Sequence, residues 1–284
     1  PDPLAPPPNP ARTITITSER TMPSVPTANT SVAATVRPLL PAEATTTPAP
    51  LPATLLVSSD ADSPLTLTKI SRDLIKVDGF VNEAIWREIP FVDNFIGVEP
   101  DTGTPGSYPT KLRITYNEDG LYVSAIMEQP IDSLVKRLSG RDVRDNRDSL
   151  TVTIDTSGEG RYGYWFGINL GDALMDGTVL PERQFLSDWD GPWYGRSQTI
   201  ANGGSAEIFI PWGMVSMPAA TGTRSMGVYV SRKVAHLDER WAWPALPSTQ
   251  PKFMTALNTL KMEDVQPRQQ YSIYPFAATA YDWG

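Results

Sequence analysis

The sequence predicts an all-β fold, a β-sandwich with one short helix, preceded by an extended arm rich in proline and threonine. Short runs of alternating polar and apolar residues recur between gaps that contain proline and glycine, which is the pattern of paired strands. A useful helical pattern appears once, at residues 82–88. The composition also changes sharply, because all 8 Trp, 10 Tyr and 8 Phe lie from Phe80 onward. We therefore expect one β domain behind a segment of different character.

Residues 1–64 are expected to form an extended arm or linker. They contain 14 of the 28 prolines and no aromatic side chain, so they bury too little apolar surface to offset the entropy of ordering. Fully extended, the arm reaches on the order of 200 Å, and the alternating residues 13–17 suit addition to an exposed sheet edge. These features predict self-association through residues 1–64.

The β domain is expected to span residues 65–265. It opens with two short strands at 65–70 and 74–77, and Asp78-Gly79 then makes a turn. Asn82 is placed to cap the short helix that ends at Glu88, with Trp86 on its buried face.

A hairpin follows the helix. Residues 111–116 alternate strictly between polar and apolar, and residues 117–120 (NEDG) turn the chain into a second strand at 121–126. Further strands are predicted at 149–155, 162–170, 205–210 and 226–231. Residues 266–284 are expected to be an extended C-terminal segment.

The composition excludes several classes of function. Zero Cys removes thiol nucleophiles, disulfides and cysteine-ligated metals, and the one histidine, His236, cannot form a His-rich metal site. A net charge of −8 argues against nucleic-acid binding. No apolar stretch approaches the ~18 residues of a membrane helix. The chain begins with Pro1, so we expect a processed product without its signal peptide.

Residues 77–86 (VDGFVNEAIW) resemble the opening of family 9 carbohydrate-binding modules (CBM9) and related DOMON-like domains. The resemblance continues at residues 110–126, 141–142, 148–155, 189–191, 206–212 and 227–232, and covers about residues 69–258. More narrowly, the chain resembles bacterial proteins in which such a module precedes an outer-membrane β-barrel, with residues 270–276 near the barrel's start. It implies a secreted or cell-surface protein, in the Gram-negative outer membrane or outside the cell, that binds carbohydrate or a surface glycan.

Sugar rings stack on exposed aromatic faces, and nearby carboxylates read the sugar hydroxyls. A loop rich in Gly, Pro and Asp carries such a set, and a second aromatic pair would face the same side of any strand formed at residues 239–244. The candidate ligand-binding residues are Asp188, Trp189, Asp190, Trp193, Tyr194, Arg196, Trp241 and Trp243. The alternative is that these tryptophans pack in the core, as we expect for Trp86 and Trp212.

A structural Ca²⁺ ion is the one cofactor that the sequence and the resemblance suggest, because carboxylates bind it without cysteine or histidine. Asp142, Asp145 and Asp148 are the candidate ligands, with Asp172 and Asp176 as another pair. Since arginines alternate with the first group, a network of ion pairs is the alternative interpretation.

No catalytic residue is predicted. Asp188 and Asp190 could in principle serve as a glycosidase pair, but two acids this close in a loop are common in an acidic protein. The sequence contains no serine nucleophile elbow that His236 could activate. It also contains no phosphate-binding glycine loop. Two functions remain: a non-catalytic carbohydrate-binding module, or a structural subunit of an extracellular fibre or array assembled through the arm.

Overall fold

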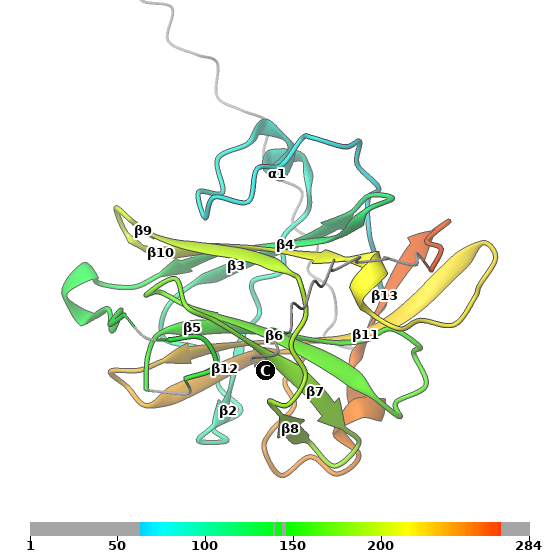
Figure 1. Ribbon diagram of the computed structural model, residues 1–284. Coiled ribbons are helices and arrows are strands. Elements are labelled where there is room, and N and C mark those ends of the chain that lie inside the picture. Colours follow the sequence, from blue (N-terminus) through cyan, green and yellow to red (C-terminus); the bar gives the residue numbers. More distant parts are fainter. Residues whose placement is uncertain (1–62, 139, 144–145, 268–284) are drawn as a thin grey trace, which may run out of the picture. The chain divides into compact units, whose positions relative to one another are not determined.

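The computed structural model describes residues 63–267 except 139, 144 and 145 (Figure 1). The chain divides into two units, residues 1–51 and 52–284, and the described residues all belong to the second. The predicted arm, residues 1–64, therefore lies almost wholly outside the described residues, as does most of the predicted segment 266–284. No helix in the described ranges is long and apolar enough to cross a membrane.

Two packed sheets form the domain, which confirms the predicted β-sandwich. The larger sheet has nine strands, with a main path β1-β13-β11-β5-β6-β7-β8, while β12 pairs with β11 and β2. Their bounds are β1 Leu65–Thr66, β2 Ile96–Glu99, β5 Ser149–Asp155, β6 Gly163–Asn169, β7 Leu174–Leu180, β8 Gln184–Leu186, β11 Thr223–Val234, β12 Glu239–Trp243 and β13 Asn258–Glu263. Only β1 and β13 run parallel among these described strand pairs.

The smaller sheet has four antiparallel strands in the order β3-β4-β10-β9. They are β3 Thr110–Tyr116, β4 Gly120–Glu128, β9 Tyr194–Ile200 and β10 Gly203–Pro211. The predicted hairpin is confirmed as β3 and β4. The Asn117 side chain forms its turn by accepting hydrogen bonds from the amides of Asp119 at 2.8 Å and Gly120 at 3.1 Å.

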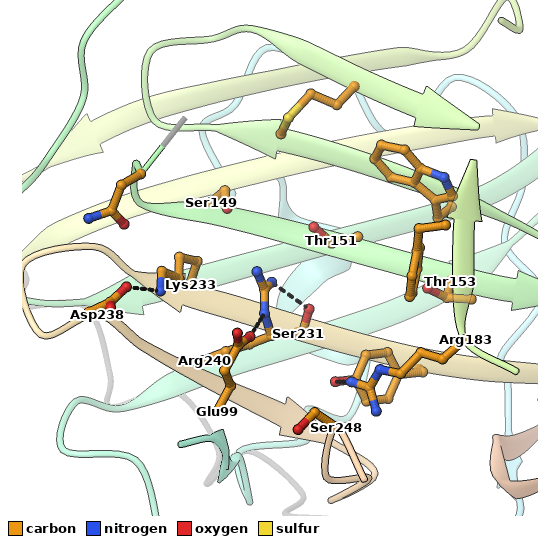
Figure 2. Close-up of a pocket in the computed structure, with 15 residues that line it drawn as sticks. Glu99, Ser149, Thr151, Thr153, Arg183, Ser231, Lys233, Asp238, Arg240 and Ser248 are labelled. Atoms are coloured by element: carbon orange, nitrogen blue, oxygen red, sulfur yellow. Dashed lines mark hydrogen bonds and ion pairs between the residues drawn. The ribbon is translucent and has the colours of Figure 1, made fainter. Parts of the chain in front are cut away.

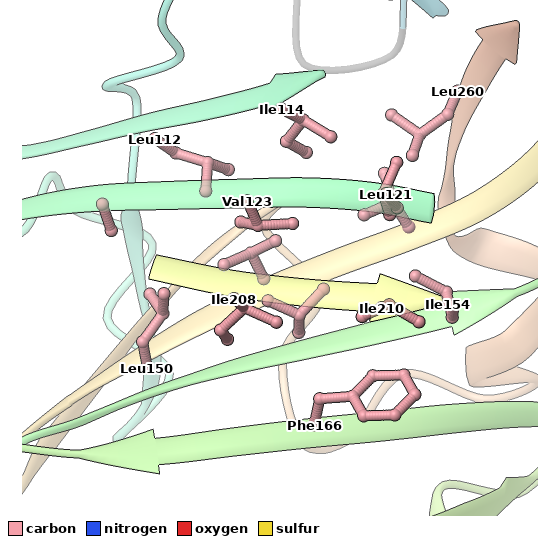
Figure 3. Close-up of a cluster of buried hydrophobic side chains, with 14 of the residues drawn as sticks. Leu112, Ile114, Leu121, Val123, Leu150, Ile154, Phe166, Ile208, Ile210 and Leu260 are labelled. Atoms are coloured by element: carbon pink, nitrogen blue, oxygen red, sulfur yellow. The ribbon is translucent and has the colours of Figure 1, made fainter. Parts of the chain in front are cut away.

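The main core fills the space between the sheets (Figure 3). Each strand turns every second side chain inward, so the alternating apolar residues of both sheets meet there. Leu112, Leu121 and Val123 of the smaller sheet are fully buried, as are Leu150 and Phe166 of the larger one.

The one α-helix in the described part of the chain, α1 Ala84–Glu88, lies over the outer face of the smaller sheet (Figure 1). Trp86 is 2% exposed and packs with Ile70 and Ile89, which confirms its predicted burial. Two local predictions were wrong. The helix is capped at Glu83 and not at Asn82, and residues 74–77 form no strand, because this segment crosses the sheet as an irregular cover.

Candidate functional site

A groove of about 620 Å³ lies on the outer face of the nine-stranded sheet (Figure 2). Residues at alternate positions of β5 line it, namely Ser149, Thr151 and Thr153, and Ser231 of the neighbouring strand β11 faces the same way. Strand geometry explains this set, because side chains two residues apart share one face. The floor of the groove therefore carries hydroxyl side chains, of which Thr151 is half-buried and Thr153 is fully buried, and the opposite face of these strands packs in the core.

Gly167 of β6 leaves this floor open. It pairs with Thr151 across the sheet. A β-carbon built on Gly167 would lie 3.2 Å from the terminal methyl of Met175 and 3.5 Å from Thr151 Oγ1. A larger side chain here would therefore project into the space beside two residues that line the groove.

One end of the groove is aromatic and holds an arginine. Trp165, Phe185 and Tyr229 line it. The guanidinium of Arg183 lies 4.5 Å from the ring centre of Phe253 and 5.3 Å from that of Tyr229. Its Nη1 donates to the carbonyls of Leu246 at 3.1 Å and Pro247 at 2.7 Å, and its Nη2 donates to the Tyr229 hydroxyl at 2.9 Å.

The remaining charges in the groove form two ion pairs. Lys233 Nζ lies 2.5 Å from Asp238 Oδ1, and this hydrogen bond lowers the pKa of the Asp238 carboxyl. Arg240 Nε lies 3.0 Å from Glu99 Oε2 and its Nη1 donates to the Ser231 hydroxyl at 3.3 Å. The groove thus combines neutral hydroxyls, aromatic edges and charged groups held in place by neighbours.

Comparisons with known proteins show which fold carries this groove. No family model matches the sequence, and no curated protein matches it. Among solved structures, a CBM9 from Caldicellulosiruptor kristjanssonii in complex with cellotriose is 13% identical, with a TM-score of 0.51 over 76% of this chain and 100% of that one. A proposed carbohydrate-binding protein from Bacteroides uniformis is 12% identical, with a TM-score of 0.54 over 70% and 98%. The chain has a CBM9-like fold.

The CBM9-like core contains three of the predicted sugar-binding tryptophans. Trp193 is 4% exposed, Trp241 1% and Trp243 0%, so a sugar ring cannot reach their faces. The prediction of binding by these three rings was wrong, and the core alternative is correct for them. Trp189 is half-buried against the rings of Tyr164 and Phe166.

Tyr194 is the exposed aromatic of the predicted loop. Its side chain is 60% exposed on β9 and stacks on Phe209 of β10, with ring centres 6.2 Å apart. Phe209 also contacts Tyr122 of β4, so these rings form a row across the smaller sheet. Arg196 lies farther along β9, 3.7 Å from Asp172. Tyr194 and Arg196 line a second cavity, separate from the groove.

The predicted loop is tied to the larger sheet by charge. Asp176 of β7 accepts the amide hydrogen of Gly191 at 2.8 Å, and Arg141 bridges Asp176 and Asp190. Burial raises the pKa of Asp176, while its hydrogen bond from Gly191 and the charge of Arg141 lower it. Asp188 is exposed. Arg141 thus pairs with two acids outside the first predicted calcium group, and its Nε also lies 3.7 Å from Asp142 Oδ2, which supports the ion-pair alternative for Arg141 and Asp142.

The predicted calcium ligands have other partners. Asp142 accepts the Asp176 amide at 3.2 Å, and buried Asp148 accepts the amides of Val135 and Ala235. Asp145 lies outside the described residues, so the three-residue set stays a prediction. Within the described ranges, one group of three carboxylates converges, and it contains Asp78, Glu83 and Glu207. No local motif indicates this group, because Glu207 is over 120 residues from the other two in the chain.

Glu207 holds the segment of residues 70–89, called the cover segment below, to the smaller sheet. Its Oε2 accepts the amides of Asp78 and Gly79, both at 3.0 Å, and its Oε1 accepts the indole N–H of Trp86 at 2.8 Å. Burial raises the pKa of Glu207 to about 7, and these three donors oppose the rise.

We expect this group to make stability depend on pH. Because the folded-state pKa of Glu207 exceeds its ordinary value of 4.5, its stabilising contribution is complete below about pH 4.5 and is lost as pH rises through about 7. Urea unfolding of the wild type and of Glu207→Gln is measured from pH 4.5 to 8. The difference between their free energies of unfolding gives the contribution of Glu207 at each pH. A difference that does not change with pH would contradict the expectation.

Proposed function

We propose that the protein is a non-catalytic, exported module that binds carbohydrate in the groove on the nine-stranded sheet. The observation that carries this proposal is the groove's lining, with hydroxyl side chains along β5 and β11 and the partly exposed ring of Phe185, while the rings of Trp165 and Tyr229 are buried beside them. Sugars offer hydroxyls that both donate and accept hydrogen bonds, together with apolar ring faces. A volume of about 620 Å³ also lies within the usual range for small-molecule sites.

The charged groups of the groove suit binding better than catalysis. Glycoside hydrolysis requires one carboxyl group that donates a proton and a second that acts as a base or nucleophile. Both carboxylates that line the groove, Glu99 and Asp238, are already ion-paired with Arg240 and Lys233. They are therefore suited to hold the side chains of Lys233 and Arg240 in place and to accept hydrogen bonds from sugar hydroxyls. Structures with this fold include a CBM9 complex with cellotriose, which supports the proposal.

Filling the floor of the groove should weaken binding strongly. Gly167→Val places a branched side chain beside Thr151, and the terminal methyl of Met175 can move to admit it. Valine also favours the strand conformation. We expect the dissociation constant for a bound oligosaccharide to rise about ten-fold or more, equivalent to ~1.4 kcal/mol or more, with the melting temperature preserved.

Isothermal titration calorimetry against a panel of neutral and acidic oligosaccharides measures this effect. Gly140→Val is the matched control, because Gly140 is exposed and a β-carbon there would come no closer than 3.8 Å to a neighbour. Unchanged affinity in folded Gly167→Val would place the sugar elsewhere. The residues Tyr194 and Arg196 of the second cavity, with Asp188, Trp189 and Asp190 of the loop, would then be the next candidates.

Assembly through residues 1–64 stays a prediction, since these residues lie almost wholly outside the described ranges. The described part of the smaller sheet ends at β9, which pairs with β10 on one side. This edge suits strand addition, although Asp172 already accepts the amide hydrogen of Ser197. Sedimentation of the full chain and of residues 53–284 tests assembly through the arm. We expect concentration-dependent oligomers for the full chain only.

A further inference from the structure

Arg183 carries a positive charge that no carboxylate in the described part of the chain neutralises. The groove holds three cationic side chains, of which Lys233 and Arg240 are paired with Asp238 and Glu99. The polar partners of Arg183 are two backbone carbonyls and the hydroxyl of Tyr229. The groove is therefore net positive in a protein whose net charge is −8.

The hydrogen-bond arrangement leaves one edge of this guanidinium available. A guanidinium has five N–H donors. Nη1 uses its donors on the carbonyls of Leu246 and Pro247, and Nη2 uses one on Tyr229. The Nε–H and the second Nη2–H have no partner among the described residues, and these two nitrogens form one side of the planar group.

The position of Arg183 is fixed by its surroundings. Its guanidinium lies close to the rings of Phe253 and Tyr229, and the two carbonyls hold its Nη1 end. A held guanidinium loses less entropy when it binds a planar anion than a free side chain does. Such an edge matches the two oxygens of a carboxylate, because two parallel charge-assisted hydrogen bonds can form.

We propose that the groove selects a carboxylated sugar, a hexuronic acid residue within a glycan, whose carboxylate binds the free edge of Arg183. This inference rests on the proposed carbohydrate binding and names its ligand class. The hydroxyls of Ser231 and Thr151 would contact the neighbouring sugar hydroxyls. One uncompensated cation fits one carboxylate, so the preference concerns a single uronic acid position in the bound glycan.

The test compares each acid with its own neutral methyl ester. The probes are trimers of β-1,4-glucuronic, α-1,4-galacturonic, β-1,4-mannuronic and α-1,4-guluronic acid, their methyl esters, and cellotriose with and without 6-O-sulfate. We expect the full-length protein to bind at least one acid about ten-fold more tightly than its ester, the scale of one charge-assisted hydrogen-bond pair. This ratio should fall as the salt concentration rises.

Two variants assign the preference to Arg183. Arg183→Gln removes the charge. Ser248→Asp places a carboxylate on an exposed residue that lines the groove and follows Pro247, so it competes for Arg183 without disturbing the core. Both should reduce the ratio of acid to ester affinity to near one while the ester still binds. Arg161→Gln is the control, because it removes the same charge from a side chain that is 83% exposed and lies away from the groove lining.

The outcomes separate the two proposals. If neutral trimers or esters bind as tightly as every acid, the acid preference is wrong while carbohydrate binding stands. If no probe binds, the proposed function fails with it. A persisting preference in folded Arg183→Gln and in Ser248→Asp would overturn the role of Arg183. Tighter binding of the sulfated trimer than of any uronate would overturn the carboxylate assignment.

Discussion

Replacing Arg232 with methionine is expected to lower the free energy of unfolding by about 3–5 kcal/mol, the usual cost of removing one partner from a buried charged network. Arg232 lies on β11 and is 1% exposed. Burial lowers its pKa to about 10, and the nearby Asp148 raises it, so the guanidinium stays charged at neutral pH.

The expected loss is large because Arg232 connects the two sheets. Its Nη1 donates to the carbonyl of Pro109 at 3.0 Å and to the hydroxyl of Thr110 at 2.9 Å. Its Nη2 donates to the carbonyl of Glu128 at 2.8 Å and to the side chain of Gln129 at 3.0 Å. Methionine fills part of the volume, yet it removes a donor from each of these four buried acceptors, of which the Pro109 carbonyl keeps the amide of Glu128 at 3.0 Å.

Urea unfolding at neutral pH measures this loss, and two variants control it. Arg232→Lys keeps the charge but cannot reach four acceptors with the same planar geometry, so its stability should fall between those of the wild type and the methionine variant. Arg161→Gln removes an exposed charge and should change the free energy of unfolding by less than about 0.5 kcal/mol. An Arg232→Met variant as stable as the wild type would show that the network contributes nothing to stability.

Much of the fold follows from local patterns that the sequence displays. The hairpin at β3 and β4 has alternating residues on both sides of the predicted turn, which the Asn117 side chain stabilises in the structure. The pair Trp241 and Trp243 shares one side of a strand, as predicted, and both rings are buried. The spacing of two residues is enough to show that the two rings lie on the same side of the strand. Whether that side is buried depends on which face of the larger sheet the smaller sheet covers.

The groove could not be predicted because its residues meet only through sheet pairing. Thr151 and Ser231 are 80 positions apart and become neighbours through the register of β5 with β11. Arg183 follows β7 in a short turn with no local motif, and its role appears only when Tyr229 and Phe253 pack against it. The composition of the aromatic loop favoured a prediction of sugar binding. A tryptophan in a glycine-rich loop can nevertheless insert into the core, as Trp193 does.

Replacing Trp86 with alanine is expected to cost about 3–5 kcal/mol of stability, the usual range for truncation of a buried aromatic side chain. The helix α1 has five residues, too few to be stable without tertiary contacts. Trp86 supplies those contacts by packing with Ile70 and Ile89. Its loss should release α1 and the cover segment from the smaller sheet.

Trp86→Phe separates the hydrogen bond of this residue from its packing. Phenylalanine keeps most of the apolar contact but removes the indole N–H that Glu207 accepts at 2.8 Å. We expect it to cost about 1–3 kcal/mol, because the buried carboxylate oxygen loses a donor. A cycle of Trp86→Phe, Glu207→Gln and the double variant, measured by urea unfolding, gives the coupling energy of the pair.

That coupling decides how the cover segment is attached. Glu207 also accepts the amides of Asp78 and Gly79, so the turn and the helix share one anchor on β10. If the anchor acts as a unit, Trp86→Phe should destabilise the protein less once Glu207 is glutamine. Hydrogen exchange of residues 70–89 should then accelerate in either single variant before the rest of the domain opens. Additive effects, with exchange unchanged in this segment, would show that packing alone holds the cover on the sheet.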